Sequence, residues 1–209
     1  MDAAVVPTTL TVRGTTSDIG LGGRTPAGGV TVAAYEEGAT TPVAMTTSAA
    51  DGTYTLTITT NGTPLNGYVL GTSSGKKDTY LYPAGPLTGD IDGATILMLT
   101  QAIFEAASNL AQGGQTDGMG WIGVQIYDGA NTAVAGVTVS SSPTGTVRYN
   151  GANGLPTASG TATMADGVAY IFNVAPGQVT VNATGGGMTF KSHAVNARAD
   201  QVTLTLVQP

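Results

Sequence analysis

The feature that most limits the fold of this chain is an internal repeat. Residues 29–32 read Gly-Val-Thr-Val and recur as residues 136–139, and an Ala-Asp-Gly segment at 50–52 recurs at 165–167. The spacing between copies changes by a few residues, as expected when insertions fall in loops. A repeat of about 110 residues is too long for a solenoid and has the size of a β-sandwich domain. The sequence therefore predicts two tandem domains of one kind.

Each copy shows the alternation of half-buried strands. In residues 54–59, Tyr54, Leu56 and Ile58 fall on one face and threonine on the other. Asn61-Gly62 and Asn66-Gly67 are turn pairs. Strands are expected at residues 8–14, 30–35, 42–47, 54–59 and 94–99, and in the second copy at 122–127, 137–139, 170–172, 179–181 and 202–206. Threonine-coated strands of this kind need few large apolar residues.

One helix interrupts the β pattern, at about residues 101–112. Apolar residues at 96, 99, 103, 106, 107 and 110 keep the spacing of one helix face, and Gly113-Gly114 follows as a terminator. We expect this face to bury against one or both domains. The predicted boundaries are 1–99 for the first sandwich, 100–116 for the linker helix and 117–209 for the second sandwich.

Composition excludes several classes of function. The chain has 7 Lys and Arg against 13 Asp and Glu, no Cys and one His. Zinc, thiolate and multi-histidine sites are excluded, as is a basic surface for nucleic acid, and no cofactor is expected. No apolar run approaches the length of about 20 residues that a membrane span needs.

The composition also indicates where the protein resides. Residues 1–7 read as a short extended lead-in without a charged region followed by an apolar stretch. A chain rich in Thr and Gly and poor in Lys and Glu favours export from a bacterium. We expect an extracellular, periplasmic or cell-surface location.

The order of these segments resembles a known family. A strand is followed by Ala-Gly-Val-Thr-Val (135–139), Ala-Asp-Gly (165–167), Tyr170, the turn Pro176-Gly177 and Val-Thr-Val (179–181). This pattern is similar to the carboxypeptidase regulatory-like domains, which belong to the transthyretin-like (prealbumin-type) β-sandwiches, and it covers most of both copies. The resemblance implies an all-β fold of two tandem seven-stranded Greek-key (Ig-like/transthyretin-like) sandwiches joined by one short α-helix. It implies no catalytic residues.

The second copy contains an insertion at residues 146–156. This segment holds Arg148 beside Tyr149, together with several Gly, Asn and Pro residues. One interpretation is a two-strand extension with an Asn-Gly turn. The other is a ligand site, because long ordered loops on sandwiches often carry binding residues.

Aromatic residues suggest a second place for a ligand. Tyr80 and Tyr82 fall on one face of a strand, and Trp121 and Tyr127 lie in the second copy. A row of aromatic rings can stack on sugars. The alternative is packing in a core or between domains, with Trp121 against the linker helix.

A serine hydrolase is a further alternative. Residues 71–75 match the Gly-x-Ser-x-Gly pattern around Ser73, and His193 is the one available imidazole, with Asp166 or Asp128 as its partner. The pattern requires a strand, a sharp turn and a helix, whereas Lys76-Lys77-Asp78 follows here. His193 is more simply read as an exposed or hydrogen-bonded structural residue.

Calcium is the metal for which the acidic residues are candidate ligands. Asp51-Gly52 and Asp166-Gly167 lie just before strands and are interpreted as tight turns. Asp90 and Asp92 are the better calcium candidates because they lie two apart before Gly93, although no Glu follows at the twelfth position. The default expectation is that no metal binds.

Taken together, these patterns predict a non-catalytic structural or binding module of an exported bacterial surface protein. The partner is expected to be a polysaccharide or another surface protein. The alternatives are a carbohydrate-binding accessory module using Tyr80, Tyr82, Trp121, Tyr127, Arg148 and Tyr149, and an esterase using Ser73 and His193.

Overall fold

A computed structural model describes residues 5–20 and 22–209. The first four residues of the expected lead-in lie outside this part of the chain. The chain divides into two compact units, Met1–Gln101 (unit 1) and Ala102–Pro209 (unit 2). Within the described residues, the structure has no helix with both the length and the apolar character needed to cross a membrane.

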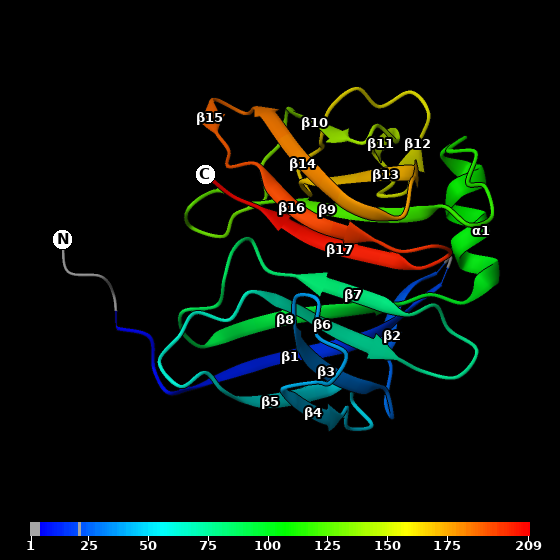
Figure 1. The fold of residues 1–209 in the computed structure, drawn as a ribbon. Helices are drawn as coiled ribbons and strands as arrows, with labels where there is room; N and C mark the ends of the chain where they lie inside the picture. The colour runs from blue at the N-terminus through cyan, green and yellow to red at the C-terminus, as the bar shows by residue number, and fades with distance from the viewer. Residues whose placement is uncertain (1–4, 21) are drawn as a thin grey trace. The chain divides into compact units, whose positions relative to one another are not determined.

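Unit 1 is built from strands in two sheets (Figure 1). Its strands are β1 (Thr9–Gly20), β2 (Gly23–Pro26), β3 (Thr31–Glu36), β4 (Ala44–Thr47), β5 (Thr53–Thr59), β6 (Gly67–Thr72), β7 (Thr79–Tyr82) and β8 (Ile91–Met98). One sheet holds β1 with β2 and β5 along one edge and β8 along the other. The second sheet has the order β4-β3-β6-β7, with every pair antiparallel.

The core of unit 1 lies between these two sheets. On β5, Tyr54, Leu56 and Ile58 are buried while the threonines between them are exposed, which confirms the predicted alternation. These side chains meet Val32 of β3 and Val69 of β6 in one apolar cluster. Alternation of this kind lets a thin apolar layer hold two sheets together.

Unit 2 repeats the arrangement with one strand placed differently. Its strands are β9 (Gly120–Ile126), β10 (Val137–Ser142), β11 (Thr146–Asn150), β12 (Pro156–Thr157), β13 (Val168–Val174), β14 (Gly177–Gly185), β15 (Met188–Thr189), β16 (His193–Ala197) and β17 (Val202–Val207). Antiparallel pairs join β12, β11, β13 and β9, and β17 then pairs with β9 in parallel. The second sheet joins β10, β15 and β16 to β14.

These sheets confirm an all-β sandwich but not the predicted count of seven strands in each copy. The described residues form eight strands in unit 1 and nine in unit 2. The three shortest strands are β2, β12 and β15, with four, two and two residues. Strand β12 belongs to the two-strand extension that one interpretation of residues 146–156 predicted, whereas β2 and β15 are too short to show an alternation in the sequence.

The helix α1 (Gln101–Leu110) lies where it was expected, but it turns another face inward. Phe104, Ser108 and Ala111 are buried, whereas Leu110 is half exposed. The predicted stripe was wrong because its phase was set partly by Ile96 and Leu99. Ile96 belongs to strand β8, and Leu99 lies between that strand and the helix.

Tight turns occur at the predicted Asp-Gly pairs. The Asp51 carboxylate accepts the Thr53 N–H at 3.0 Å, and Asp166 accepts the Val168 N–H at 3.1 Å. Asn61-Gly62 is also a turn with positive φ at both residues. Gly67 is different, because its φ is not positive and a Cβ there would lie 1.9 Å from the Tyr35 carbonyl oxygen. Close strand approach, not a turn, requires that glycine.

Candidate functional site

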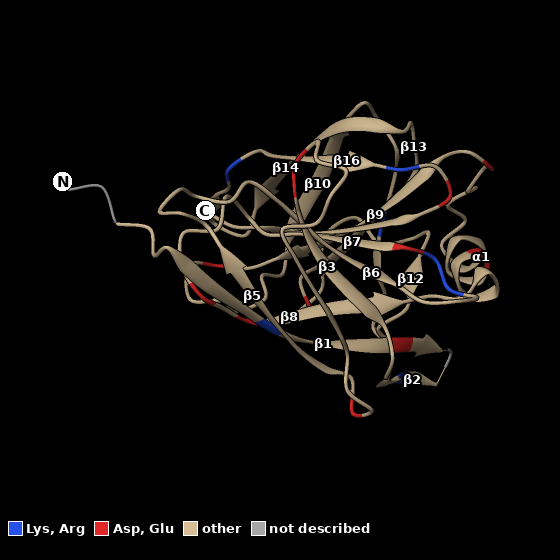
Figure 2. Ribbon diagram, turned by 60° about the horizontal axis from the view of Figure 1, so that its bottom comes forward, with Lys and Arg blue, Asp and Glu red and all other residues tan. Residues whose placement is uncertain are grey.

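Within residues 5–20 and 22–209, charged residues do not gather into a site. In Figure 2 they form short coloured segments separated by long uncharged stretches of ribbon. Among the described residues no group of three or more His, Asp or Glu could hold a metal ion. The calcium candidates have other contacts: Asp90 Oδ1 accepts the Thr11 N–H at 2.7 Å, and Asp92 Oδ1 lies 3.4 Å from Arg13 Nη1.

Tyr80 and Tyr82 belong to a cluster of tyrosines on the second sheet of unit 1. The ring of Tyr68 lies 5.4 Å from that of Tyr80, 5.3 Å from that of Tyr82 and 5.5 Å from that of Tyr35. The Tyr68 ring is nearly parallel to that of Tyr35 but tilted from the other two, and Tyr82 is only 4% exposed. The rings pack on one another, so Tyr80 and Tyr82 do not form a flat row.

Trp121 lies in a second aromatic cluster, within unit 2. Its ring centroid is 5.3 Å from those of Phe104 on α1 and Phe172 on β13. The side chain is buried, and its Nε1 has no hydrogen-bond partner within the described chain. This arrangement confirms the alternative in which Trp121 packs against the helix.

Arg148 also contacts the helix, at its C-terminal end. Its Nε donates to the Ala111 carbonyl at 2.6 Å and its Nη2 to the Gln112 carbonyl at 3.1 Å. Carbonyls at the end of a helix have no partner within the helix, and a cation is favourable there. Arg148 therefore caps α1.

The insertion is a two-strand extension with a Gly turn, as one interpretation predicted. Strands β11 and β12 pair through Tyr149 and Thr157, and Gly154 in the turn has positive φ. The Tyr149 hydroxyl accepts the Val139 N–H at 2.8 Å, and burial raises its pKa. Tyr127 makes an isolated bridge with Ala133.

Ser73 does not lie in the setting that a nucleophilic serine requires. It begins a turn between β6 and β7, in which its carbonyl accepts the Lys76 N–H at 3.2 Å. A strand follows this turn, whereas the hydrolase elbow leads into a helix.

His193 and Asp166 do not form a catalytic pair. The Asp166 carboxylate accepts Asn150 Nδ2 at 2.7 Å and the Val168 N–H, while Asp128 accepts the N–H groups of Ala130 and Thr132 at 2.8 Å. His193 Nε2 is buried with no hydrogen-bond partner in the described chain. Burial lowers the His193 pKa. The residue is thus neither exposed nor satisfied at Nε2, contrary to the expectation.

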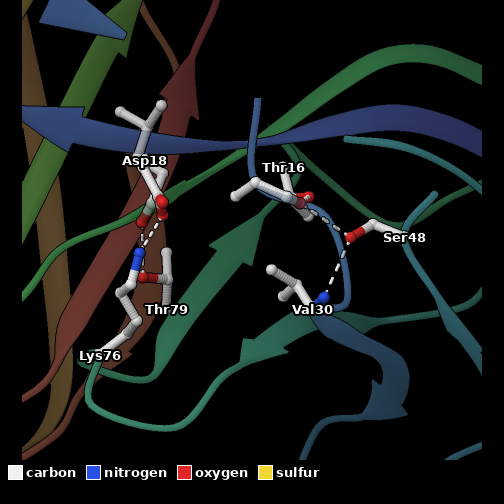
Figure 3. Close-up of polar contacts among 8 residues, drawn as sticks. Thr16, Asp18, Val30, Ser48, Lys76 and Thr79 are labelled. Atoms are coloured by element: carbon white, nitrogen blue, oxygen red, sulfur yellow. Dashed lines mark hydrogen bonds and ion pairs between the residues drawn. The ribbon is translucent and has the colours of Figure 1, made fainter. Parts of the chain in front are cut away.

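A hydroxyl in each unit joins two loops through backbone groups. In unit 1, Ser48 Oγ donates to the Ala27 carbonyl at 2.9 Å and accepts the Val30 N–H at 3.0 Å (Figure 3). In unit 2, Thr163 Oγ1 donates to the Val134 carbonyl at 2.7 Å and accepts the Val137 N–H at 3.0 Å. We call Ser48 and Thr163 the hydroxyl bridges. Neither was predicted, because Ser and Thr are too common here to attract notice.

An ion pair joins two distant segments of unit 1, and no local sequence pattern indicates it. Lys76 Nζ contacts the Asp18 carboxylate, joining the turn after β6 to the end of β1 (Figure 3). The two side chains are 21% and 38% exposed, so water screens the pair in part. It fastens the first sheet of unit 1 to the second.

In both units the first and last long strands are parallel neighbours. Val12 on β1 pairs with Ile91 on β8, and the register runs to Asp18 and Met98. In unit 2, β9 and β17 pair from Trp121 and Val202 onward, as far as Ile126 and Val207. The first and last long strands of each unit are therefore adjacent and hydrogen-bonded.

Side chains strengthen this pairing in unit 1. Beside the Thr11–Asp90 and Arg13–Asp92 contacts, the hydroxyls of Thr15 and Thr95 lie 3.4 Å apart. In unit 2 the additional contacts near β9 and β17 are mainly between backbone groups. For example, the Tyr127 N–H donates to the Val207 carbonyl at 3.1 Å.

Comparisons with known proteins identify no family. No family model matches this sequence. No curated protein matches it.

Some solved structures are weakly similar to the chain. The shaft pilin SpaA from Lactobacillus rhamnosus GG is 14% identical at a TM-score of 0.31, with 97% of this chain and 98% of that one covered. The minor pilin GBS52 of Streptococcus agalactiae is 12% identical at 0.30, covering 97% and 96%. The Bacillus anthracis TIE protein is 13% identical at 0.30, and the match spans 95% of this chain but only 34% of that protein. TM-scores this low carry no argument about function.

Proposed function

We propose that this chain is a non-catalytic structural module of an exported bacterial surface protein, and that its units transmit tension. The units act as two tandem Greek-key sandwiches, residues 1–99 and 117–209, with residues 100–116 as the helical connection. The partner is another surface protein, and the location is extracellular, periplasmic or at the cell surface.

The supporting observation is the parallel pairing of β1 with β8 and of β9 with β17. When the chain is pulled from its ends, the entry strand and the exit strand of a unit move in opposite directions along their own axes. All the hydrogen bonds between them then resist together, in shear. Backbone bonds stretched together give way at a higher force than bonds opened one at a time.

The composition supports the location. The chain has no Cys, and only 10% of its residues are charged. Exposed threonines such as Thr55 and Thr57 coat the strands in place of Lys and Glu. The fold therefore contains no disulfide, and the surface carries few charges that could attract other molecules.

Single-molecule pulling tests the proposal. The chain is tethered at its two ends and stretched, and each unit should unfold in one step. The segment from Thr9 to Met98 should release about 300 Å of chain in unit 1. Since the chain has no Cys, an introduced cysteine gives a unique second attachment point.

The matched control pulls unit 1 between its N-terminus and an Asn61→Cys variant. Thr9 pairs with Thr59, so this force opens the β1–β5 bonds from one end, one at a time. We expect an unfolding force several-fold lower than in the end-to-end geometry. Equal forces in the two geometries would refute the tensile role.

A further inference from the structure

The outer edge of β5 in unit 1 presents backbone groups without partners. Strand β5 pairs with β1 alone among the described strands. Just beyond the two ends of β5, the Thr16 N–H donates to the Gly52 carbonyl and the Thr60 N–H donates to the Thr8 carbonyl. Even-numbered residues of this segment thus direct their backbone groups toward β1. Because backbone groups alternate along an antiparallel strand, those of Thr55, Thr57 and Thr59 point away from it.

This edge lacks the devices that usually guard a sheet edge. Residues 53–59 contain no charge and no proline, and their register with β1 has no bulge. The β2 edge of the same sheet carries Arg24 and Pro26. Charges, prolines and bulges on edge strands are what prevent pairing with another chain.

In unit 2 the counterpart of β5 is β13, and β11 pairs with it. The free edge of unit 2 lies instead on its other sheet, where β10 is the outer strand. The Val137 N–H and carbonyl bond to Thr163, and the Val139 N–H donates to the Tyr149 hydroxyl. Thr163 and Tyr149 therefore occupy part of the β10 edge that an added strand would need, whereas no such groups cover the β5 edge of unit 1.

We propose that the β5 edge binds the β5 edge of a second copy of this chain. The two strands run antiparallel about a two-fold axis at Thr57. Thr57 then faces its own counterpart, and Thr55 faces Thr59 of the other copy. Each of these three pairs exchanges two backbone hydrogen bonds, which joins the two four-stranded sheets into one.

A second copy fits this edge better than other occupants for two reasons. The edge is self-complementary, since the same three threonines supply donors and acceptors on both sides, and threonine pairs across strands are favourable. It is also uncharged in a protein of net charge −6, so two copies meet where their repulsion is weakest. One pair of strand edges makes a small interface, so the association is weak and depends on concentration.

Sedimentation velocity over about a hundredfold range of concentration tests the proposal. Wild-type protein should pass from monomer to dimer. Thr57→Lys places two like charges opposite each other and should weaken the dimer by about fivefold or more, as should Thr57→Glu. An equimolar mixture of the two variants should recover association, because the facing charges are then opposite.

The matched control is Thr138→Lys, which puts the same charge on an exposed threonine of β10. It should leave the dimer unchanged, and thermal unfolding of every variant shows whether it is folded. A wild-type chain that stays monomeric overturns the proposal. So does a dimer that survives both Thr57 variants, or a mixture that fails to associate when each variant is folded.

Discussion

The two units use the same contacts at their turns and differ in the course of one strand. Ser48 and Thr163 hold equivalent backbone groups, and Gly52 and Gly167 accept the N–H of Thr16 and Ile126 at 2.8 Å in both cases. In unit 1, β4 follows β3 in the sequence and pairs with it. In unit 2, β11 follows β10 in the same way, but it does not pair with β10. It pairs instead with β13, in the sheet that contains β9.

This difference moves the free edge from one sheet to the other. Unit 1 covers β3 and leaves β5 open, whereas unit 2 covers β13 and leaves β10 to be closed by side chains. The two units thus share the hydrogen bonds at their turns, whereas the segment between β3 and β5 pairs with a different sheet from the one between β10 and β13.

The largest effect is expected from Gly52→Ala and Gly167→Ala. Both glycines have positive φ, and a Cβ would lie 2.4 Å from the Thr16 carbonyl oxygen or 2.5 Å from that of Ile126. Each change should lower the free energy of unfolding of its own unit by about 3 kcal/mol. Urea titration measures the loss, with Trp121 fluorescence reporting on unit 2 because it is the one tryptophan.

Gly29→Ala and Gly136→Ala serve as controls for that result. Both residues have positive φ, but nothing lies within 4 Å of a Cβ there. They should cost about 1 kcal/mol, the conformational term alone. Losses equal to those of Gly52 and Gly167 would show that the carbonyl contact is unimportant.

Removing the hydroxyl bridges should have the next largest effect. Thr163→Val keeps the shape of the side chain but leaves the Val137 N–H and the Val134 carbonyl without that partner, as Ser48→Ala does in unit 1. We expect a loss of about 2 kcal/mol in each unit, measured by the same titrations. If only one unit is destabilised, the two hydroxyl bridges do not contribute equally to the free energy of unfolding.

Much of the shared arrangement could be predicted from the sequence. The repeated Gly-Val-Thr-Val and Asp-Gly segments mark the positions where strands and turns recur, because alternation and positive φ leave a signature within a few residues. Tyr54, Leu56 and Ile58 were assigned to the core on alternation alone, and they are buried.

Contacts between distant segments could not be predicted. Which sheet receives residues 146–150 depends on pairing with β13, some twenty residues away, and a local pattern says nothing about it. The inward face of α1 was misjudged because the phase of the stripe included Ile96 and Leu99, which precede the helix, whereas Phe104 packs against Trp121 from another strand. The aromatic residues were proposed as ligand residues from their type alone, and residue type does not show whether a side chain is exposed.

Tyr149→Phe tests the closed edge of unit 2. The change removes the oxygen that accepts the Val139 N–H, a buried contact with no counterpart on the β5 edge. We expect a loss of about 1 kcal/mol in unit 2 and faster hydrogen exchange at the Val139 amide. Tyr54→Phe is the comparator, because its hydroxyl donates to the Ala94 carbonyl at 2.8 Å in unit 1 and closes no edge. Unchanged exchange at Val139 would mean that the edge is closed by other means.

The smallest effect concerns pH and distinguishes the units, because the one histidine lies in unit 2. Burial lowers the pKa of His193 below its ordinary value of 6.5, so the unfolded chain binds the proton more readily than the folded unit. The stability of unit 2 should therefore fall as the pH drops through 6.5, and this loss should stop once the folded imidazole is also protonated. Urea titrations followed by Trp121 fluorescence, repeated across this range, should show the slope, and His193→Gln should remove it. The unfolding of unit 1, followed by NMR at its own residues, should show no such slope, and a slope that persists in the glutamine variant would assign the effect to another group.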